Sequence, residues 1–302
     1  MSWTTHHEDS VLFRAALTFT AATTGFLARL IEKDYFCSVV LERLAAANDA
    51  LTFRGGTCLA KVHTEFYRVS EDLDFVVPTP AGASRGERRT LAAPVRQAVS
   101  ALPRDVPAFR LMGPLTGANN STQYTATIGY TSLLSGQEET IRIEVGLREP
   151  LLTPVLEAEA RSILLDPITT RPLVKPVAIR CLSRREAFAE KFRAALTRRE
   201  VAIRDFYDID YGHRKIGVLP DDADLVELVR SKLAVPGTGP VDVSEGRLAM
   251  LNGQLEAQLR PVLRERDFAE FTLQRAIQAV VRMAANVTQR SSARPHLPHD
   301  EA

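Results

Sequence analysis

Two adjacent glycines between a short strand and a helix constrain this chain more than any other feature of its sequence. Residues 51–53, Leu-Thr-Phe, have strand composition, and Gly55 and Gly56 separate them from residues 57–65, which have helical composition. Glycines at such a turn let backbone N–H groups approach an anion, and the helix N-terminus favours negative charge there. The turn is therefore predicted to hold the phosphates of a triphosphate.

A pair of aspartates lies at the start of the next predicted strand, residues 73–77. Asp72 and Asp74 flank one residue, so both carboxylates project from the same face of the strand. Carboxylates in this arrangement bind hard divalent cations such as Mg²⁺ or Mn²⁺. Such ions bridge phosphates, activate an attacking hydroxyl and stabilise the leaving pyrophosphate. Ser70 precedes Asp72 by two residues, so its hydroxyl is expected near the metal and the phosphates.

A third carboxylate is expected on a neighbouring strand. Glu144 is the candidate, because it lies between Ile143 and Val145, two apolar residues that would face the core. The same alternating pattern equally fits a glutamate that faces solvent beside Arg142, and the sequence leaves both interpretations open.

The rest of the chain divides into a mixed half and a helical half, which predicts a bilobed α+β fold. The first domain, residues 1–175, begins with two or three helices over residues 11–47, broken near Asp34, and continues into a mixed sheet. Its other predicted elements are strands 109–112, 123–130 and 139–148, a loop at 78–89 and a helix at 90–102. The second domain, residues 176–290, contains predicted helices 184–200, 222–233, 245–263 and 268–287. Residues 291–302 are expected to form a flexible tail.

Composition excludes several classes of protein. The 38 Lys and Arg nearly cancel the 37 Asp and Glu, leaving a formal charge of +1, so any RNA-binding face must be local. The sequence has no apolar run long enough for a membrane span and no secretory start, so a cytoplasmic location and no membrane partner are expected. The three cysteines, Cys37, Cys58 and Cys181, match no metal-ligand or disulfide spacing and are interpreted as buried thiols.

Four motifs, in order, resemble the AbiEii-type nucleotidyltransferase toxins, which include the MenT toxins, within the DNA-polymerase-β-like superfamily. The resemblance covers about two-thirds of the chain. It is carried by Glu32-Lys-Asp-Tyr35, by Phe53-Arg-Gly-Gly-Thr-Cys-Leu-Ala-Lys61 with Arg68-Val-Ser-Glu-Asp-Leu-Asp-Phe75, by Glu190-Lys-Phe-Arg-Ala-Ala-Leu196 and by Arg204-Asp-Phe-Tyr-Asp208. Cys58 departs from the small residue usual at its position.

The resemblance implies roles for residues in both predicted domains. Gly55, Gly56 and Thr57 would hold phosphate, and Ser70, Asp72 and Asp74 would form the metal motif. Lys191 and Asp205 would complete the catalytic site from the helical domain, with Lys191 countering the charge of an NTP. Asp208 lies in the same short segment as Asp205, so which of the two is the essential acid stays open. Judged without the resemblance, the sequence favours a solvated lysine at position 191 that pairs with a neighbouring glutamate.

The resemblance also implies the substrate and the partners. The acceptor would be RNA, by likeness the 3′ end of tRNA, so that translation stops, and an antitoxin protein would be the partner. The residues alone leave two alternatives, which are transfer to a small-molecule or protein hydroxyl and a non-catalytic nucleotide-binding module. Six arginines between Arg184 and Arg204 form either a solvated helix face or an RNA contact. Phosphorylation of Ser70 would place a dianion among the carboxylates and would switch the enzyme off.

Overall fold

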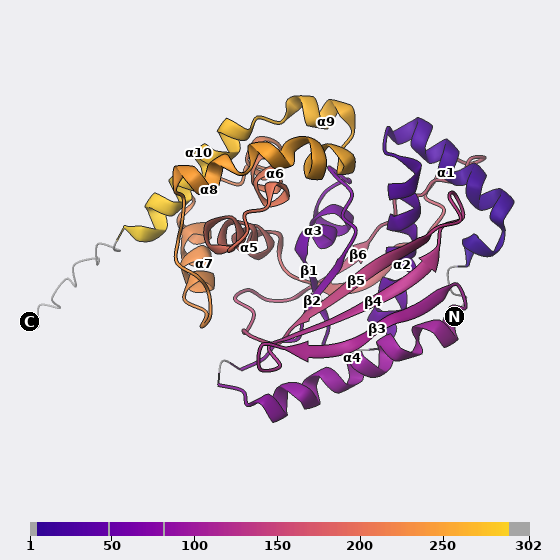
Figure 1. Cartoon of the computed structure of the whole chain (residues 1–302), viewed down its shortest axis with the longest axis horizontal. Coiled ribbons are helices and arrows are strands. Elements are labelled where there is room, and N and C mark those ends of the chain that lie inside the picture. Colours follow the sequence, from indigo (N-terminus) through magenta and orange to yellow (C-terminus); the bar gives the residue numbers. More distant parts are fainter. Residues whose placement is uncertain (1–4, 48, 81, 290–302) are drawn as a thin grey trace, which may run out of the picture.

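The computed structural model describes residues 5–47, 49–80 and 82–289, and it shows a mixed sheet flanked by helices with a helical lobe beside it (Figure 1). The sheet has seven strands in the order β3-β4-β5-β2-β1-β7-β6. These strands are β1 (Thr52–Arg54), β2 (Leu73–Val76), β3 (Phe109–Ala118), β4 (Gln123–Thr131), β5 (Glu138–Gly146), β6 (Leu156–Ala160) and β7 (Val177–Cys181). The predicted α+β class is confirmed.

The centre of the sheet brings together strands that are far apart in the sequence. β2 runs antiparallel to β1 and parallel to β5, whereas β7 joins the other side of β1 in parallel. The side chains of β2 that face the core, Leu73 and Phe75, are fully buried. The intervening residue, Asp74, therefore projects from the opposite face of the strand.

The N-terminal helices are η1 (His6–Glu8), α1 (Ser10–Thr24) and α2 (Ala28–Ala47). The predicted break at Asp34 is wrong, because α1 ends at Gly25, which adopts a left-handed conformation with φ 80°. Asp34 lies inside α2, and its carboxylate meets Lys61 Nζ at 2.6 Å and Ser162 Oγ at 3.0 Å. Buried polar partners, not solvent exposure, therefore account for this charged side chain inside the helix.

One face of the sheet is covered by α2 and by α4 (Arg85–Asp105), which pack against each other and against β7 and β3 respectively. α4 begins inside the loop predicted for residues 78–89, because Ser84 and Glu87 form a capping box at its first turn. β6 and β7 were not predicted, since exposed Glu157 and Glu159 on β6 and a proline-containing run before β7 mask their strand patterns.

The helical lobe is built on α5 (Arg184–Thr197), whose buried side chains form a separate apolar core with those of the later helices. Those helices are α6 (Ile203–Tyr211), η3 (Gly212–Ile216), α7 (Ala223–Leu233), α8 (Glu245–Ala249), η4 (Asn252–Gln254), η5 (Leu255–Leu259), η6 (Arg260–Val262), α9 (Glu265–Glu270) and α10 (Leu273–Thr288). The helices predicted for 245–263 and 268–287 are each interrupted. Gly253 and Pro261 lie in the first of these interrupted stretches, and both residues disfavour a regular helix interior.

At the end of β7 the chain passes from the first apolar core to the second, since Cys181 belongs to the first and Leu182 to the second. The second core also contains Leu59, Ala60, Tyr67 and Val76 from the first half of the chain. A division of the chain into two domains near residue 176 stays a proposal, and β7 itself still lies in the sheet. The predicted tail, 291–302, lies outside the described residues. Within the described part of the chain no single helix is long and apolar enough to cross a membrane; α1 and α2 meet that test only together, across a 116° bend.

Candidate active site

Asp74 lies at the centre of the candidate site, because its strand pairs with a neighbour on each side. In the sheet register it stands opposite Arg54 of β1 and opposite Glu144 of β5. Burial, together with the negative charges of Glu144 and Asp72, raises the pKa of Asp74 to about 6 despite the positive charge of Arg54. Two further carboxylates beside a buried one favour a bound cation there.

Asp72 lies just before β2, where its side chain is exposed. Glu144 is partly exposed and accepts a hydrogen bond from Arg142 at 3.2 Å, so its electrostatic effect on Asp74 coexists with the solvent-side pair that the sequence also allowed. Among the described residues, only Cys58, His63 and Cys181 form a set of three possible metal ligands whose atoms all lie within 4.8 Å of one another. The three carboxylates are therefore more widely spaced than this.

The Gly-Gly turn packs directly against the aspartate motif. Gly55 has φ +77°, and a Cβ atom added to it would lie 2.2 Å from Asp74 Oδ2. A Cβ atom on Gly56 would lie 2.3 Å from Arg68 Nη2 and 3.1 Å from Ser70 Oγ. Only glycines leave room for these contacts, so the two motifs that are separate in the sequence form one site.

The turn continues into α3 (Gly55–Cys58) and η2 (Leu59–His63). Thr57 is buried there, and its hydroxyl donates a hydrogen bond to the backbone carbonyl of Asp72. This bond fixes the start of β2 relative to the turn. Phosphate binding by Thr57 stays a prediction, as does phosphate binding by Gly55, Gly56 and the half-buried Ser70.

Lys191 comes from α5 and reaches two aspartates of α6. Its Nζ atom lies 3.0 Å from Asp205 Oδ1 and 2.8 Å from Asp208 Oδ2. Burial by itself lowers the pKa of Lys191, but the negative charges of Asp208 and Asp205 outweigh it and raise the pKa. The partners are thus aspartates of the helical lobe, not the glutamate that the alternative interpretation supposed.

The two aspartates differ in their surroundings. Asp208 is fully buried and accepts hydrogen bonds from the Tyr67 hydroxyl at 2.6 Å and from Arg68 Nη2 at 2.8 Å. Asp205 is bound by Lys191 and, at 2.9 Å, by Arg198, whose side chain is 56% exposed. Asp208 therefore ties the aspartate-motif segment to the helical lobe, whereas Asp205 stands closer to solvent.

A cavity of about 900 Å³ is lined by strands of the sheet, by α4 and α5 and by residues 236–239. Glu144 is the one predicted site residue in its lining, which also contains Arg54, the residue opposite Asp74 in the sheet. Its charged lining is mostly positive. The arginines are Arg54, Arg88, Arg148, Arg193 and Arg198, against the acids Glu144 and Glu149. We call this space the arginine cavity. Burial and the nearby charge of Arg193 lower the pKa of Arg148, which indicates crowded positive charge suited to an anion.

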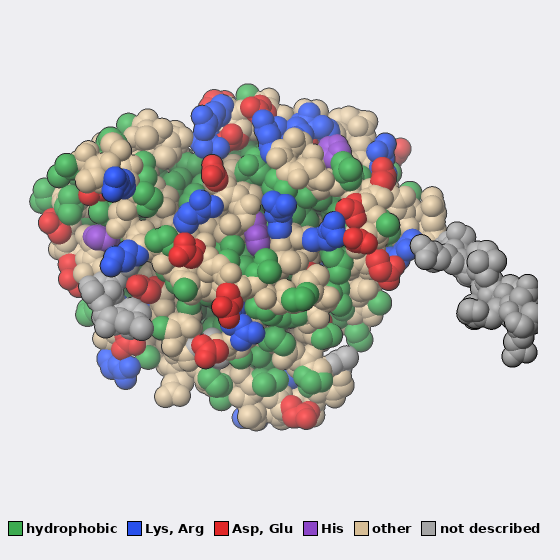
Figure 2. Space-filling view, turned by 180° about the vertical axis from the view of Figure 1, so that it is seen from behind, with side chains coloured by type: hydrophobic (Ala, Val, Ile, Leu, Met, Phe, Trp, Pro, Cys, Tyr) green, Lys and Arg blue, Asp and Glu red, His purple; other side chains and the backbone are tan. Residues whose placement is uncertain are grey.

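Of these arginines, Arg193 and Arg198 belong to the basic stretch noted in the sequence, whereas Arg54, Arg88 and Arg148 were missed because they meet only through the fold. On the face opposite to that of Figure 1, basic and acidic side chains of the described residues are interspersed (Figure 2). The concentration of arginines in the cavity therefore differs from the mixed surface of that face.

The fold and the motifs define the class of a nucleotidyltransferase, and sequence comparison agrees with this. A family model described as nucleotidyl transferase AbiEii toxin, type IV toxin–antitoxin system, matches residues 39–287. The chain belongs to this family of nucleotidyltransferase toxins. No curated protein matches the chain significantly.

Among the solved structures that resemble the chain, one supports the same fold. The nucleotidyltransferase toxin MenT4 from Mycobacterium tuberculosis H37Rv aligns over 86% of this chain and 85% of its own, with a TM-score of 0.51 and 18% identity. A putative nucleotidyltransferase from H. pylori aligns over 82% and 92% of the two chains, with a TM-score of 0.43 and 14% identity. The JHP933 protein of Helicobacter pylori covers 84% and 91%, with a TM-score of 0.45 and 14% identity.

Proposed function

We propose that this chain transfers a nucleotidyl group from an NTP to RNA, at the 3′ end of tRNA, and thereby stops translation. The observation that carries the proposal is the position of Asp74, which stands opposite Glu144 in the sheet and against Gly55 of the turn. Transfer from a triphosphate uses a divalent cation that carboxylates hold close to the bound phosphates. Asp74, beside the glycine turn, can supply such a carboxylate.

Asp72 and Asp74, with Glu144 as a third ligand, would hold a divalent cation, either Mg²⁺ or Mn²⁺. The positive side chains near these carboxylates pair with other acids, so a cation can bind the carboxylates. Arg54 pairs with Glu190 at 3.2 Å, and Lys191 pairs with the aspartates of α6. When bound, the ion would neutralise phosphate charge and activate the acceptor hydroxyl.

The remaining residues would bind and orient the substrates. Backbone N–H groups at Gly55 and Gly56 would receive the phosphates, and Lys191 would add positive charge from the other lobe. The arginine cavity would hold the phosphates of the NTP or of the acceptor. Asp205 would set the position and charge of Lys191, which lies 3.0 Å away, and Asp208 would hold Arg68 against the turn.

Three further parts of the proposal concern the cell. The protein would act in the cytoplasm, where tRNA and NTP are present, and a cognate antitoxin would neutralise it, as the family's assignment to toxin–antitoxin systems implies. Phosphorylation of Ser70 would block the site, since its Oγ atom lies 3.1 Å from the Cβ position of Gly56 and a phosphate there would occupy the turn. Full activity in a Ser70→Glu variant would contradict the proposal that phosphorylation of Ser70 blocks the site.

The decisive experiment incubates the purified protein with total tRNA, Mg²⁺ and each labelled NTP in turn, with Asp72→Ala as the control. Label on tRNA from the wild type and none from the variant supports the proposal and identifies the nucleotide. Label on protein or on a small molecule points to another hydroxyl acceptor. No label anywhere, with Asp72→Ala and Asp74→Ala leaving growth effects unchanged, points to a non-catalytic module.

A further inference from the structure

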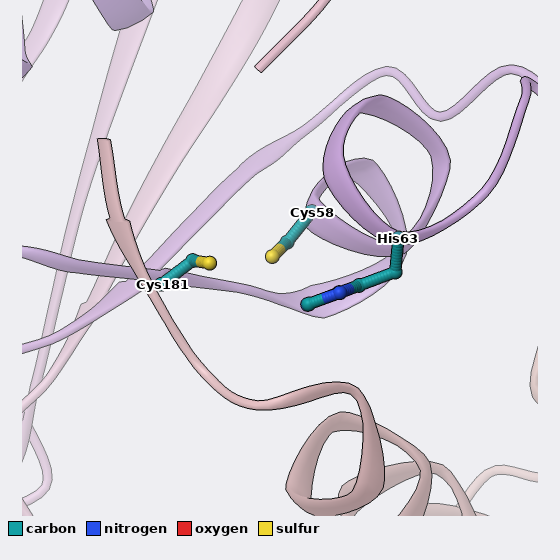
Figure 3. Close-up of side chains that lie close together, drawn as sticks. All are labelled: Cys58, His63 and Cys181. Atoms are coloured by element: carbon teal, nitrogen blue, oxygen red, sulfur yellow. The ribbon is translucent and has the colours of Figure 1, made fainter. Parts of the chain in front are cut away.

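Three side chains that could bind a soft metal meet behind the glycine turn (Figure 3). Cys58 is the last residue of α3, His63 the last of η2 and Cys181 the last of β7. The sheet brings them together, because Phe53 of β1 stands opposite Cys181 and accepts a hydrogen bond from the Leu182 backbone at 3.0 Å. We call these three residues the Cys–His site.

The three donors and their spacing fit three of the four ligand positions of a tetrahedral metal ion, and a water molecule would take the fourth. One ligand atom from each residue lies within 4.8 Å of the other two. Two sulfurs bound to one zinc ion at about 2.3 Å each would stand a little under 4 Å apart, so only a small approach of the ligand atoms is needed to bind one ion. Thiolate and imidazole ligands select zinc-like ions, whereas the carboxylates near Asp74 select Mg²⁺ or Mn²⁺. The two sites would therefore bind different metals.

The orientation of His63 is fixed by a hydrogen bond of the kind that metal-bound histidines make. Its Nε2 atom lies 2.9 Å from the carbonyl oxygen of Leu182. A carbonyl oxygen can only accept, so Nε2 carries the hydrogen, and in the neutral ring Nδ1 keeps a free lone pair. Such a bond to a backbone carbonyl fixes both the tautomer and the direction of a ligating imidazole.

Charge and access also favour an ion at this position. Both sulfurs are fully buried, whereas His63 is half-buried and offers a route from solvent. A divalent cation and two thiolates sum to zero charge, which removes the cost of a buried net charge.

We propose that Cys58, His63 and Cys181 bind one Zn²⁺ ion, which fastens the helix after the glycine turn to the end of β7. The site is separate from the carboxylates and does not depend on the proposed transfer reaction. Its effect reaches the active site through Thr57, which adjoins Cys58 and donates its hydroxyl hydrogen bond to Asp72. Zinc would therefore stabilise the turn and the start of β2 together.

The test titrates reduced, metal-free, full-length protein with Co²⁺ and then displaces the Co²⁺ with Zn²⁺. One equivalent of Co²⁺ is expected to give a sulfur-to-cobalt charge-transfer band and the visible bands of a tetrahedral ion. Zn²⁺ should abolish both, whereas Mg²⁺ should leave them unchanged. Zn²⁺ should also raise the melting temperature of the wild type.

Variants assign the ligands. Cys58→Ser, Cys181→Ser and His63→Gln should each weaken Co²⁺ binding by more than the roughly 10- to 100-fold that loss of an outer hydrogen-bond partner costs. Cys37→Ser is the matched control, since Cys37 is equally buried but lies outside the site, where its thiol approaches the Glu71 carbonyl at 3.6 Å. This control should bind Co²⁺ and gain stability from Zn²⁺ like the wild type.

Several outcomes would overturn the proposal. These are a wild-type titration without a sulfur charge-transfer band, unchanged binding in Cys58→Ser, or mass-spectrometric detection of a Cys58–Cys181 disulfide in protein purified without reductant. If the cysteine variants fail to fold, the wild-type spectrum and the half-buried His63→Gln substitution still decide. Loss of nucleotidyl transfer alone, with Co²⁺ bound at the sulfurs, would concern the proposed function and not this site.

Discussion

Arg68 and Asp208 form a buried ion pair that joins the two lobes, with Arg68 Nη2 2.8 Å from Asp208 Oδ2 and relative exposures of 2% and 0%. Burial alone raises the pKa of Asp208, but the positive charges of Arg68 and Lys191 hold it well below its usual range. The guanidinium of Arg68 also occupies the space that a side chain on Gly56 would fill. The position of the glycine turn therefore depends on an aspartate of α6.

This pair predicts different consequences for the two aspartates of α6. Asp208→Asn leaves Arg68 buried without its counter-charge, so the free energy of unfolding should fall by about 3–5 kcal/mol. Asp205→Asn should cost about 1–2 kcal/mol, because Lys191 keeps Asp208 and the other partner, Arg198, is exposed. Urea unfolding of both variants measures the difference. Equal losses of stability would contradict the assignment of Asp208 as the link between the lobes.

The contact between Gly55 and Asp74 predicts that Gly55→Ala damages the site and the fold together. The new Cβ would lie 2.2 Å from Asp74 Oδ2, and φ of +77° costs a non-glycine residue roughly 1–2 kcal/mol. We expect transfer activity to be lost and the melting temperature to drop. Gly246→Ala is the control, because Gly246 lies in α8 with nothing within 4 Å of an added Cβ. A wild-type melting curve for Gly55→Ala would refute the close contact.

The parts of the site that lie close together in the sequence were predictable from it. The glycine turn and the aspartate motif each carry their own local sequence pattern, and the strand period alone places Asp72 and Asp74 on one face. The pattern of α5 likewise places Phe188 and Phe192 in the core, which the structure confirms. In each case local periodicity carries the information.

The parts that depend on strand pairing were not predictable. The parallel pairing of β1 with β7 brings Cys58 and Cys181 close together, and neither the strand pattern nor the cysteine spacing encodes that register. The distinction between Asp205 and Asp208 depends on Arg68, which lies far away in the sequence. A long-range partner of this kind leaves no periodic trace in either segment.

The position of Glu144 predicts a loss of activity without a loss of stability. Glu144→Gln removes a charge opposite Asp74, while its own ion pair, with the exposed Arg142, contributes little to folding. Transfer should fall at least about 10-fold, with the free energy of unfolding changed by less than about 0.5 kcal/mol. The matched control is Glu138→Gln on the same strand, which loses a similar exposed pair with Arg110 at 3.0 Å. Equal activity in the two variants would make Glu144 a solvent-facing glutamate.

The close packing of arginines in the arginine cavity predicts that Arg148 contributes more to anion binding than to the stability of the fold. Arg148→Gln relieves repulsion from Arg193 and removes an ion pair with Glu149 at 3.7 Å, so the free energy of unfolding should change little. Binding of a non-hydrolysable NTP should weaken about 5- to 10-fold, with a shallower dependence on salt concentration. Calorimetry at two salt concentrations measures both effects. Arg185→Gln is the control, since Arg185 lies on α5, the helix that carries Arg193, but pairs with Asp222 and Asp224 outside the cavity. An identical salt dependence in Arg148→Gln and wild type would exclude the cavity as the anion site.

The lowered pKa of Glu190 predicts how the free energy of unfolding depends on pH in acid. Burial raises its pKa, but Arg54, Lys232 and Arg193 outweigh burial and lower the pKa from 4.5 to about 2. Because the folded pKa is the lower one, this stabilisation is complete above pH 4.5 and disappears as the pH falls toward 2. The difference between the two values is worth about 3 kcal/mol. Glu190→Gln should therefore lose about this much at neutral pH and show a flatter decline of stability in acid.

Denaturant unfolding at several pH values tests this prediction. The exposed glutamate Glu159 of β6 provides the control, and Glu159→Gln should keep the wild-type dependence on pH. If Glu190→Gln declined as steeply as the wild type between pH 4.5 and 2, another carboxylate would control acid unfolding. Asp208 would then be the first to test, because the charges of Arg68 and Lys191 lower its pKa in the same way.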